Sequence, residues 1–188
     1  MEEIYGETFT QKDYTQQPLV KGEYEDCHFE SCNFSENDLS GCVFLECSFT
    51  GCNLSLVKLG NTAFREVNFK DCKMLGMRFD QCNKFLFNIS TENCNCNNAS
   101  FFQVKLAKAT FRSTQFREAD LSECDLGGSV FDQCDFSHAV FDQTVLEKAD
   151  LRTSFHYSID PEQNRIRQAK FSLAGLPGLL GKYQIEID

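Results

Sequence analysis

The sequence predicts an all-β solenoid in which the chain turns a corner every five residues. Two observations support this fold class. Every fifth residue is large and apolar over most of the 188-residue chain, and the residue two positions earlier is small. A helical stripe recurs every three or four residues and a flat strand alternates every two, so neither produces a period of five. A strict period of five requires corners that return the large side chains to one axis, and such internal repeats are typical of solenoids.

The large positions form two runs. The first run holds fifteen successive positions: Phe9, Tyr14, Leu19, Tyr24, Phe29, Phe34, Leu39, Phe44, Phe49, Leu54, Leu59, Phe64, Phe69, Met74 and Phe79. The second run holds eleven: Phe101, Leu106, Phe111, Phe116, Leu121, Leu126, Phe131, Phe136, Phe141, Leu146 and Leu151. Since 22 residues separate Phe79 from Phe101, two extra residues enter between the runs. We expect them within residues 80–85, with Leu86 at a large, inward position. Both a simple bulge and a small contact surface remain open for this break.

Cysteine is abundant, and its positions indicate its role. Ten of the eleven cysteines fall on the small position of the repeat, and Cys96 falls on a large one. Cysteine can serve there as a small buried hydrophobe. We therefore expect reduced thiols. Cys94 and Cys96 lack a second pair and a partner histidine at ligand spacing, so we expect no metal site.

The repeating unit resembles that of a known family. Its order is small, polar, Leu or Phe, polar, polar, as in Ala119–Glu123 (ADLSE) and Ala149–Thr153 (ADLRT). This resembles the pentapeptide-repeat family over about residues 5–155. The resemblance implies a right-handed quadrilateral parallel β-helix with twenty residues per coil, hence about seven coils. Residues twenty apart should then stack. Phe9, Phe29, Phe49 and Phe69 form one expected column, and stacked rings should leave no pocket for a cofactor along the axis.

Charge is segregated along the chain, whose net charge is −10. Residues 1–50 and 113–150 are acidic, whereas residues 51–112 are basic. The second acidic segment forms a belt, which we call the acidic belt: Glu118, Asp120, Glu123, Asp125, Asp132, Asp135, Asp142, Glu147 and Asp150. Counted over four faces, these acids lie on all of them. The first seven of them are the candidate partner-binding residues, as a surface that imitates DNA. Solubility is the alternative explanation of the same charges.

No pattern of catalytic residues is present. His28, His138 and His156 lie near no candidate nucleophile in the sequence, and no phosphate-binding glycine loop occurs. We expect a protein that is not an enzyme and has no cofactor, metal or small-molecule ligand. The net charge disfavours direct binding to nucleic acid. No apolar run is long enough for a membrane span and no signal peptide is visible, so we expect a cytoplasmic protein.

The tail follows the repeats, which we expect to occupy residues 1–155. We expect residues 156–188 to cap the open end, with Ser172 capping a short helix over residues 173–180 and a final strand over residues 183–187. Apolar residues of the tail could also pair two rods end to end: Leu176, Leu179, Leu180, Ile185 and Ile187.

The tail narrows the resemblance. The string Ile159-Asp160-Pro161-Glu162, followed by Asn164-Arg165-Ile166, is similar to the end of proteins in the gyrase-interacting McbG, Qnr and MfpA group. That similarity implies a bacterial homodimer that modulates or protects DNA gyrase and topoisomerase IV, in antibiotic or toxin resistance, as a DNA mimic. The basic waist at residues 51–112 departs from a continuous DNA-like surface. An interaction scaffold of the same family with another protein partner is the alternative.

Overall fold

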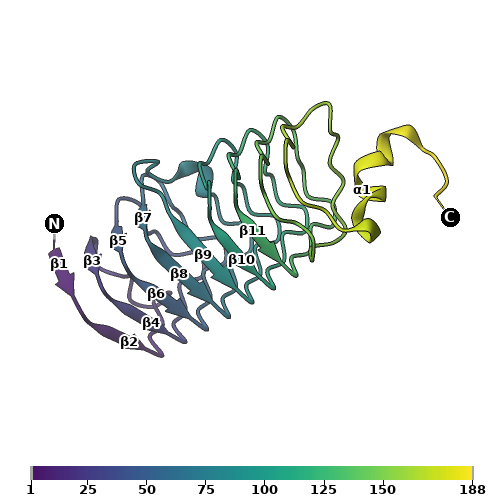
Figure 1. Cartoon of the computed structure of the whole chain (residues 1–188). Coiled ribbons are helices and arrows are strands. Elements are labelled where there is room, and N and C mark those ends of the chain that lie inside the picture. Colours follow the sequence, from purple (N-terminus) through teal and green to yellow (C-terminus); the bar gives the residue numbers. More distant parts are fainter. Residues whose placement is uncertain (1, 188) are drawn as a thin grey trace.

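The structure, a computed structural model that describes residues 2–187, is a parallel β-solenoid (Figure 1). One sheet has four strands in sequence order: β1 (Glu2–Tyr5), β3 (Gly22–Glu25), β5 (Val43–Leu45) and β7 (Ala63–Arg65). The other has seven: β2 (Thr8–Thr10), β4 (His28–Glu30), β6 (Ser48–Thr50), β8 (Val67–Lys70), β9 (Ile89–Glu92), β10 (Thr110–Arg112) and β11 (Val130–Asp132). The predicted all-β solenoid is confirmed.

Each turn of the solenoid has four sides. Two sides carry the sheets, and isolated parallel bridges such as Asn33 to Asn53 and Asp38 to Lys58 join the other two. Val43 pairs with Ala63 in the first sheet, so partners are twenty residues apart on each of these sides. Four corners at a spacing of five residues therefore account for one turn.

The corners explain the polar residues that follow each large one. At one corner the N–H of Asn37 donates to the carbonyl oxygen of Phe34 at 2.9 Å, and Glu36 has a φ of 59°. A hydrogen bond from the fourth residue to the first, with positive φ at the third, is typical of a type II turn. The same left-handed conformation recurs two residues after other large positions, at Glu46 and Glu123 for example. β-branched residues adopt it poorly, which favours unbranched and polar side chains there.

Aromatic rings fill the axis in stacked columns. Phe29 stacks on Phe9 with ring centroids 4.9 Å apart and on Phe49 at 4.7 Å, and Phe49 stacks on Phe69 at 5.1 Å. These spacings match the ~4.8 Å separation of neighbouring strands, so each ring lies in register with its own turn. The predicted column is confirmed.

All eleven cysteines are buried and free of disulfides. Eight of the thiols donate weak hydrogen bonds to backbone carbonyls of the preceding turn, as Cys47 Sγ does to Tyr24 O at 3.2 Å and Cys52 Sγ to Phe29 O at 3.3 Å. Burial raises the pKa of the Cys47 thiol to about 12. Cys47 therefore lines the wall as a small, protonated side chain.

The register break lies on the side that follows Phe79. The 3₁₀ helix η1 (Phe79–Gln81) precedes it. The backbone N–H of Asn83 donates to Thr62 O at 2.9 Å, as it does in a register of twenty residues. Further along the chain, β8 and β9 pair Val67 with Ile89, which are 22 residues apart. The two extra residues therefore enter between Asn83 and residue 88.

The expectation of an inward Leu86 was wrong. Leu86 and Phe85 are each 66% exposed, and Phe87 occupies the core, with its ring centroid 6.4 Å from that of Phe64. Leu86 takes the left-handed conformation of a corner, with φ 56°, which points its side chain outward. The larger Phe87 then fills the axis in its place.

The parallel ladder continues past Leu151, where the sequence pattern stops. Phe155, Arg165 and Lys170 form bridges with residues twenty positions earlier. Asn164 takes an inward small position, where its side-chain oxygen accepts from Thr144 N at 2.9 Å. By the count of five, His156 and Pro161 fall on large positions, but His156 is exposed at a corner with φ 60°, and the buried Tyr157 and Ile159 point inward instead. The period is therefore hidden in the sequence. The last turn thus extends 15 residues beyond the boundary that we expected at residue 155.

The tail beyond this turn packs at the C-terminal end of the rod (Figure 1). It contains η2 (Leu173–Gly175), α1 (Pro177–Leu180) and η3 (Gly181–Tyr183). The Ser172 side chain accepts from Gly175 N at 3.1 Å, so the predicted cap is confirmed. The predicted strand over residues 183–187 was wrong: Gln184 has a φ of 51°, and residues 184–187 pair with no strand of the described chain. A strand needs a hydrogen-bonded neighbour, and this segment has none within one molecule.

Candidate protein-binding surface

The ladder brings the acidic belt together on adjacent turns. Asp120 pairs with Ser100 on one side and Val140 on the other, and Asp125 pairs with Lys105 and Val145. The N–H of Glu123 donates to the carbonyl oxygen of Asp142 at 2.7 Å, so these two residues are also neighbours between turns. The belt thus surrounds one short length of the rod.

Aspartates in the belt have a local structural role as well as a charge. One oxygen of Asp120 accepts from Ser122 N at 2.9 Å, and one oxygen of Asp125 accepts from Gly127 N at 3.0 Å. These contacts span two residues and stabilise the corner, as Asp and Asn side chains do in turns. The second carboxylate oxygen has no such bond in the described structure and is free for a partner.

Two of the three glutamates in the belt are held by neutral neighbours. Glu118 accepts from Asn98 Nδ2 at 2.9 Å, and Glu123 accepts from Gln103 Nε2 at 2.7 Å. Amide donors orient a carboxylate without neutralising it. Both negative charges therefore stay on the surface.

Asp135 differs from the other belt residues. Its side chain is only 5% exposed, and it accepts from Arg117 Nε at 2.7 Å and from His156 Nδ1 at 3.0 Å. Burial acts to raise the pKa of Asp135, but hydrogen bonds from Ser137, Arg117 and His156 outweigh it and lower this pKa well below its usual range. Asp135 therefore holds two turns together and offers little charge to a partner. The sequence contained a signal for this cluster, since residues 135 and 156 are about one turn apart.

Ion pairs also occupy the last two belt residues. Glu147 pairs with Arg165 at 2.9 Å, and Asp150 pairs with Arg152 at 2.7 Å. Within residues 2–187, six belt carboxylates remain without an ion pair: Glu118, Asp120, Glu123, Asp125, Asp132 and Asp142. We call these six the free acidic patch. They lie on three sides of the rod: Asp120 and Asp125 belong to the bridge columns of two adjacent sides, with Glu123 at the corner between them, and Asp132 lies on β11.

The basic waist is partly neutralised. Lys70 pairs with Glu92 and Arg78 with Asp80, each at 2.8 Å. Lys105, which stacks directly beside Asp125, is exposed and has no ion pair with the described residues. The charge of the surface therefore changes from negative to positive within one turn of the patch.

The tail is docked on the last turn through close backbone contacts. Ile159 N donates to Gly178 O at 2.9 Å, and a Cβ at Gly178 would lie 2.3 Å from Tyr157 O. Lys182 pairs with Asp160 at 2.8 Å. Of the five apolar tail residues, Leu179 packs against the core and Leu180 is half-buried, whereas the others are 41 to 56% exposed: Leu176, Ile185 and Ile187.

Catalytic or metal-binding geometry does not emerge from the described residues. Ser137 and Asp135 both approach the same nitrogen of His156, at 3.1 and 3.0 Å, whereas a nucleophile and its orienting acid need opposite ring nitrogens. No three His, Cys, Asp or Glu side chains in residues 2–187 are grouped to hold a metal ion. No helix in this part of the chain is long and apolar enough to cross a membrane.

Comparison with known proteins identifies the family. The model described as "Pentapeptide repeat region" matches residues 23–101, and "Pentapeptide repeats (8 copies)" matches residues 94–133 and 119–154. The chain belongs to the pentapeptide-repeat family. A comparison with curated proteins found no significant match.

Two solved structures share the fold over its whole length. Both are of trypsin-treated variants of QnrB1, a plasmid-mediated fluoroquinolone resistance protein. The first has a TM-score of 0.73 and 18% identity and covers 100% of this chain and 92% of the other. The second has a TM-score of 0.65 and 19% identity and covers 99% and 97%. The TM-scores establish a common solenoid fold.

Proposed function

We propose that the protein is a non-enzymatic binding protein that imitates DNA and modulates or protects DNA gyrase or topoisomerase IV. The free acidic patch carries this proposal. Its six carboxylates lie on two adjacent turns, which span about 10 Å at ~4.8 Å per turn. Duplex DNA carries one negative charge per ~1.7 Å, hence about six over the same length. The fold shared with a fluoroquinolone resistance protein directs the proposal to a type II topoisomerase.

A homodimer would extend the charged surface. We propose that the exposed apolar residues Leu176, Ile185 and Ile187 pair two copies end to end at their C-termini. About seven turns give a rod of about 35 Å, so two rods would span about 70 Å, or roughly 20 base pairs. Because the patch lies toward the C-terminal end, both patches would then lie near the centre of the assembly.

The basic waist supports the second candidate, an interaction scaffold for another protein partner. A DNA-like surface would be continuous, whereas Lys105 next to Asp125 interrupts it. The experiment below separates the two candidates.

The experiment measures DNA supercoiling by gyrase, and its inhibition by a quinolone, with and without the protein. The test variant carries Asp120→Asn, Glu123→Gln and Asp125→Asn, which remove charge and keep the corner bonds, since Asn33 accepts from Ser35 N at the equivalent position. The matched control carries Glu25→Gln, Glu46→Gln and Glu66→Gln, three exposed acids near the other end without ion pairs among the described residues.

We expect the wild type and the control to change gyrase activity or quinolone inhibition, and the test variant to lose at least tenfold in potency. No effect of the wild type on gyrase or topoisomerase IV would refute the proposal and favour the scaffold. Equal potency of the two variants would move the contact away from the patch.

A further inference from the structure

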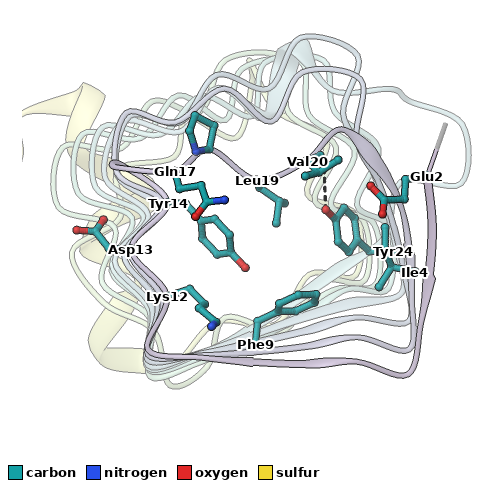
Figure 2. A pocket seen from close by; sticks show the side chains of 11 residues that line it. Glu2, Ile4, Phe9, Lys12, Asp13, Tyr14, Gln17, Leu19, Val20 and Tyr24 are labelled. Carbon is teal, nitrogen blue, oxygen red and sulfur yellow. Dashed lines mark hydrogen bonds between the residues drawn. The ribbon is translucent and has the colours of Figure 1, made fainter.

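The N-terminal end of the rod contains a hollow of about 400 Å³ (Figure 2). Its floor consists of the four large residues of the first turn: Phe9, Tyr14, Leu19 and Tyr24. The axis is filled in the interior, as we expected, but this end is not covered by the described residues. A volume of this size and an apolar floor are typical of small-molecule sites.

The ring columns stop at this hollow. Phe29 has a stacked ring on both sides, with centroids 4.9 Å from Phe9 and 4.7 Å from Phe49. Phe9 and Tyr14 have a stacked ring on the inner side only, the latter at 4.6 Å from Phe34, and no described ring lies on their outer faces. Because the rings of Phe29 and Phe34 stand at 71° to each other, a planar aromatic molecule placed there would continue one column by stacking and meet the other edge-on.

A cation stands at an inward position of this first turn. Lys12 occupies the column that contains Cys32 and Cys52 in the following turns. Its backbone is in register, since Asn33 N donates to Lys12 O at 2.8 Å. Figure 2 shows the Lys12 ammonium directed into the hollow, across from Glu2 on the opposite wall.

The Lys12 ammonium has no anionic partner within the described structure. The adjacent Asp13 carboxylate faces the outer surface and accepts from Thr15 N at 3.1 Å and Thr15 Oγ1 at 2.7 Å. No ion pair of Lys12 is formed within residues 2–187. The hollow therefore combines an aromatic floor with one unpaired positive charge.

We propose that this hollow binds a planar aromatic carboxylate, with its ring stacked on Phe9 and its edge against Tyr14, and with the carboxylate paired with Lys12. The Tyr14 hydroxyl, which points into the hollow, is placed to donate a hydrogen bond to the same ligand (Figure 2). Glu2 on the far wall repels an anion and so orients the carboxylate toward Lys12. This site is independent of the acidic patch and of any action on gyrase.

The test is a titration of the full-length protein with 2-naphthoate and with the uncharged 2-naphthamide, followed by isothermal calorimetry and by amide NMR shifts. We expect saturable binding of 2-naphthoate, with shifts at residues 9–24, and binding of the amide that is weaker by roughly three- to tenfold, as for a partly exposed ion pair. Lys12→Gln should weaken 2-naphthoate binding by the same factor and leave the affinity for 2-naphthamide unchanged.

Lys21→Gln is the matched control, because it removes the same charge at the same end of the rod from a residue outside the hollow, paired with Asp38 at 3.2 Å. It should leave both affinities unchanged. Gln17→Trp, at the exposed rim of the hollow, should block both probes. Equal affinity for the two probes, equal effects of Lys12→Gln and Lys21→Gln, or no saturable binding would overturn the proposal, and Lys12 would then be a solvated residue of the terminal turn.

Discussion

Arg117 Nε lies 2.7 Å from Oδ2 of Asp135, a carboxylate with only 5% of its side chain exposed. This contact and that of His156 with the same carboxylate join residues from neighbouring turns near the C-terminal end. A solenoid gains its stability from contacts between adjacent turns, so a polar contact of this kind strengthens one interface.

We expect Asp135→Asn to destabilise the protein by about 1.5–3 kcal/mol, because hydrogen bonds to a charged group are lost and Arg117 is left unpaired. The asparagine retains the corner bond to Ser137 N. Urea unfolding at pH 7 measures the change. Asp120→Asn, a corner aspartate without an ion pair, is the control and should cost less than about 0.5 kcal/mol. Equal effects of the two substitutions would show that the ion pair adds nothing.

The same contact predicts a pH dependence. Since the pKa of Asp135 is lowered in the folded state, its contribution to the free energy of unfolding is complete above the unfolded pKa of about 3.9 and disappears as pH falls through the lower, folded value. The difference in stability between wild type and Asp135→Asn should therefore be present at pH 5 and shrink below about pH 4. An undiminished difference at about pH 2 would contradict this.

The buried thiols should be inert in the folded protein. All eleven thiols are buried and so shielded from reagents, and burial raises the pKa of Cys47 and of Cys134 to about 12, which makes their reactive thiolates scarce at neutral pH. With a disulfide reagent at pH 8, native protein should show almost no reaction, whereas all eleven thiols should react in 8 M urea. A rapidly reacting thiol in the native protein would mean that a turn opens locally.

At the register break, the structure and the five-residue period of the sequence predict different effects of substitution. Phe87 is 9% exposed and contacts the rings of Phe64 and Phe79, whereas Leu86 is 66% exposed. We expect Phe87→Ala to cost about 3–5 kcal/mol and Leu86→Ala less than about 0.5 kcal/mol in urea unfolding. A larger loss of stability for Leu86→Ala than for Phe87→Ala would indicate that Leu86 points inward, as the five-residue period implies.

The period predicted most of the fold because each large position repeats one local environment. Columns such as Phe29 on Phe49 could be assigned by adding twenty to a residue number. Counting failed where a residue of the expected type does not take the expected inward position. Leu86 satisfies the period, but the two extra residues turn it outward and bring Phe87 in. Conversely, His156 breaks the period, yet the ladder continues to Lys170 because backbone hydrogen bonds do not depend on the side chain at a corner.

The candidate surface was predictable only in part. The acidic segment is evident from the charges, but charge alone does not separate Asp135, which is buried between Arg117 and His156, from Asp120, which is not. That distinction depends on which bases lie one turn away. The hollow at the N-terminal end was missed because Lys12 stands at a small position, which the repeat alone presents as a wall residue.

The proposed dimer predicts a specific effect of the tail. Ile185→Asp together with Ile187→Asp places two charges on exposed apolar positions that contribute nothing to the core of one molecule. We expect the variant to keep its unfolding midpoint and to be monomeric, at half the mass of the wild type, in light scattering after size exclusion. Val20→Asp together with Leu56→Asp, at similarly exposed sites near the other end, is the matched control and should remain a dimer. A wild type that is already monomeric, or a tail variant that stays dimeric, would refute end-to-end pairing through these residues, while an effect on gyrase measured with the same preparations would still test the acidic patch separately.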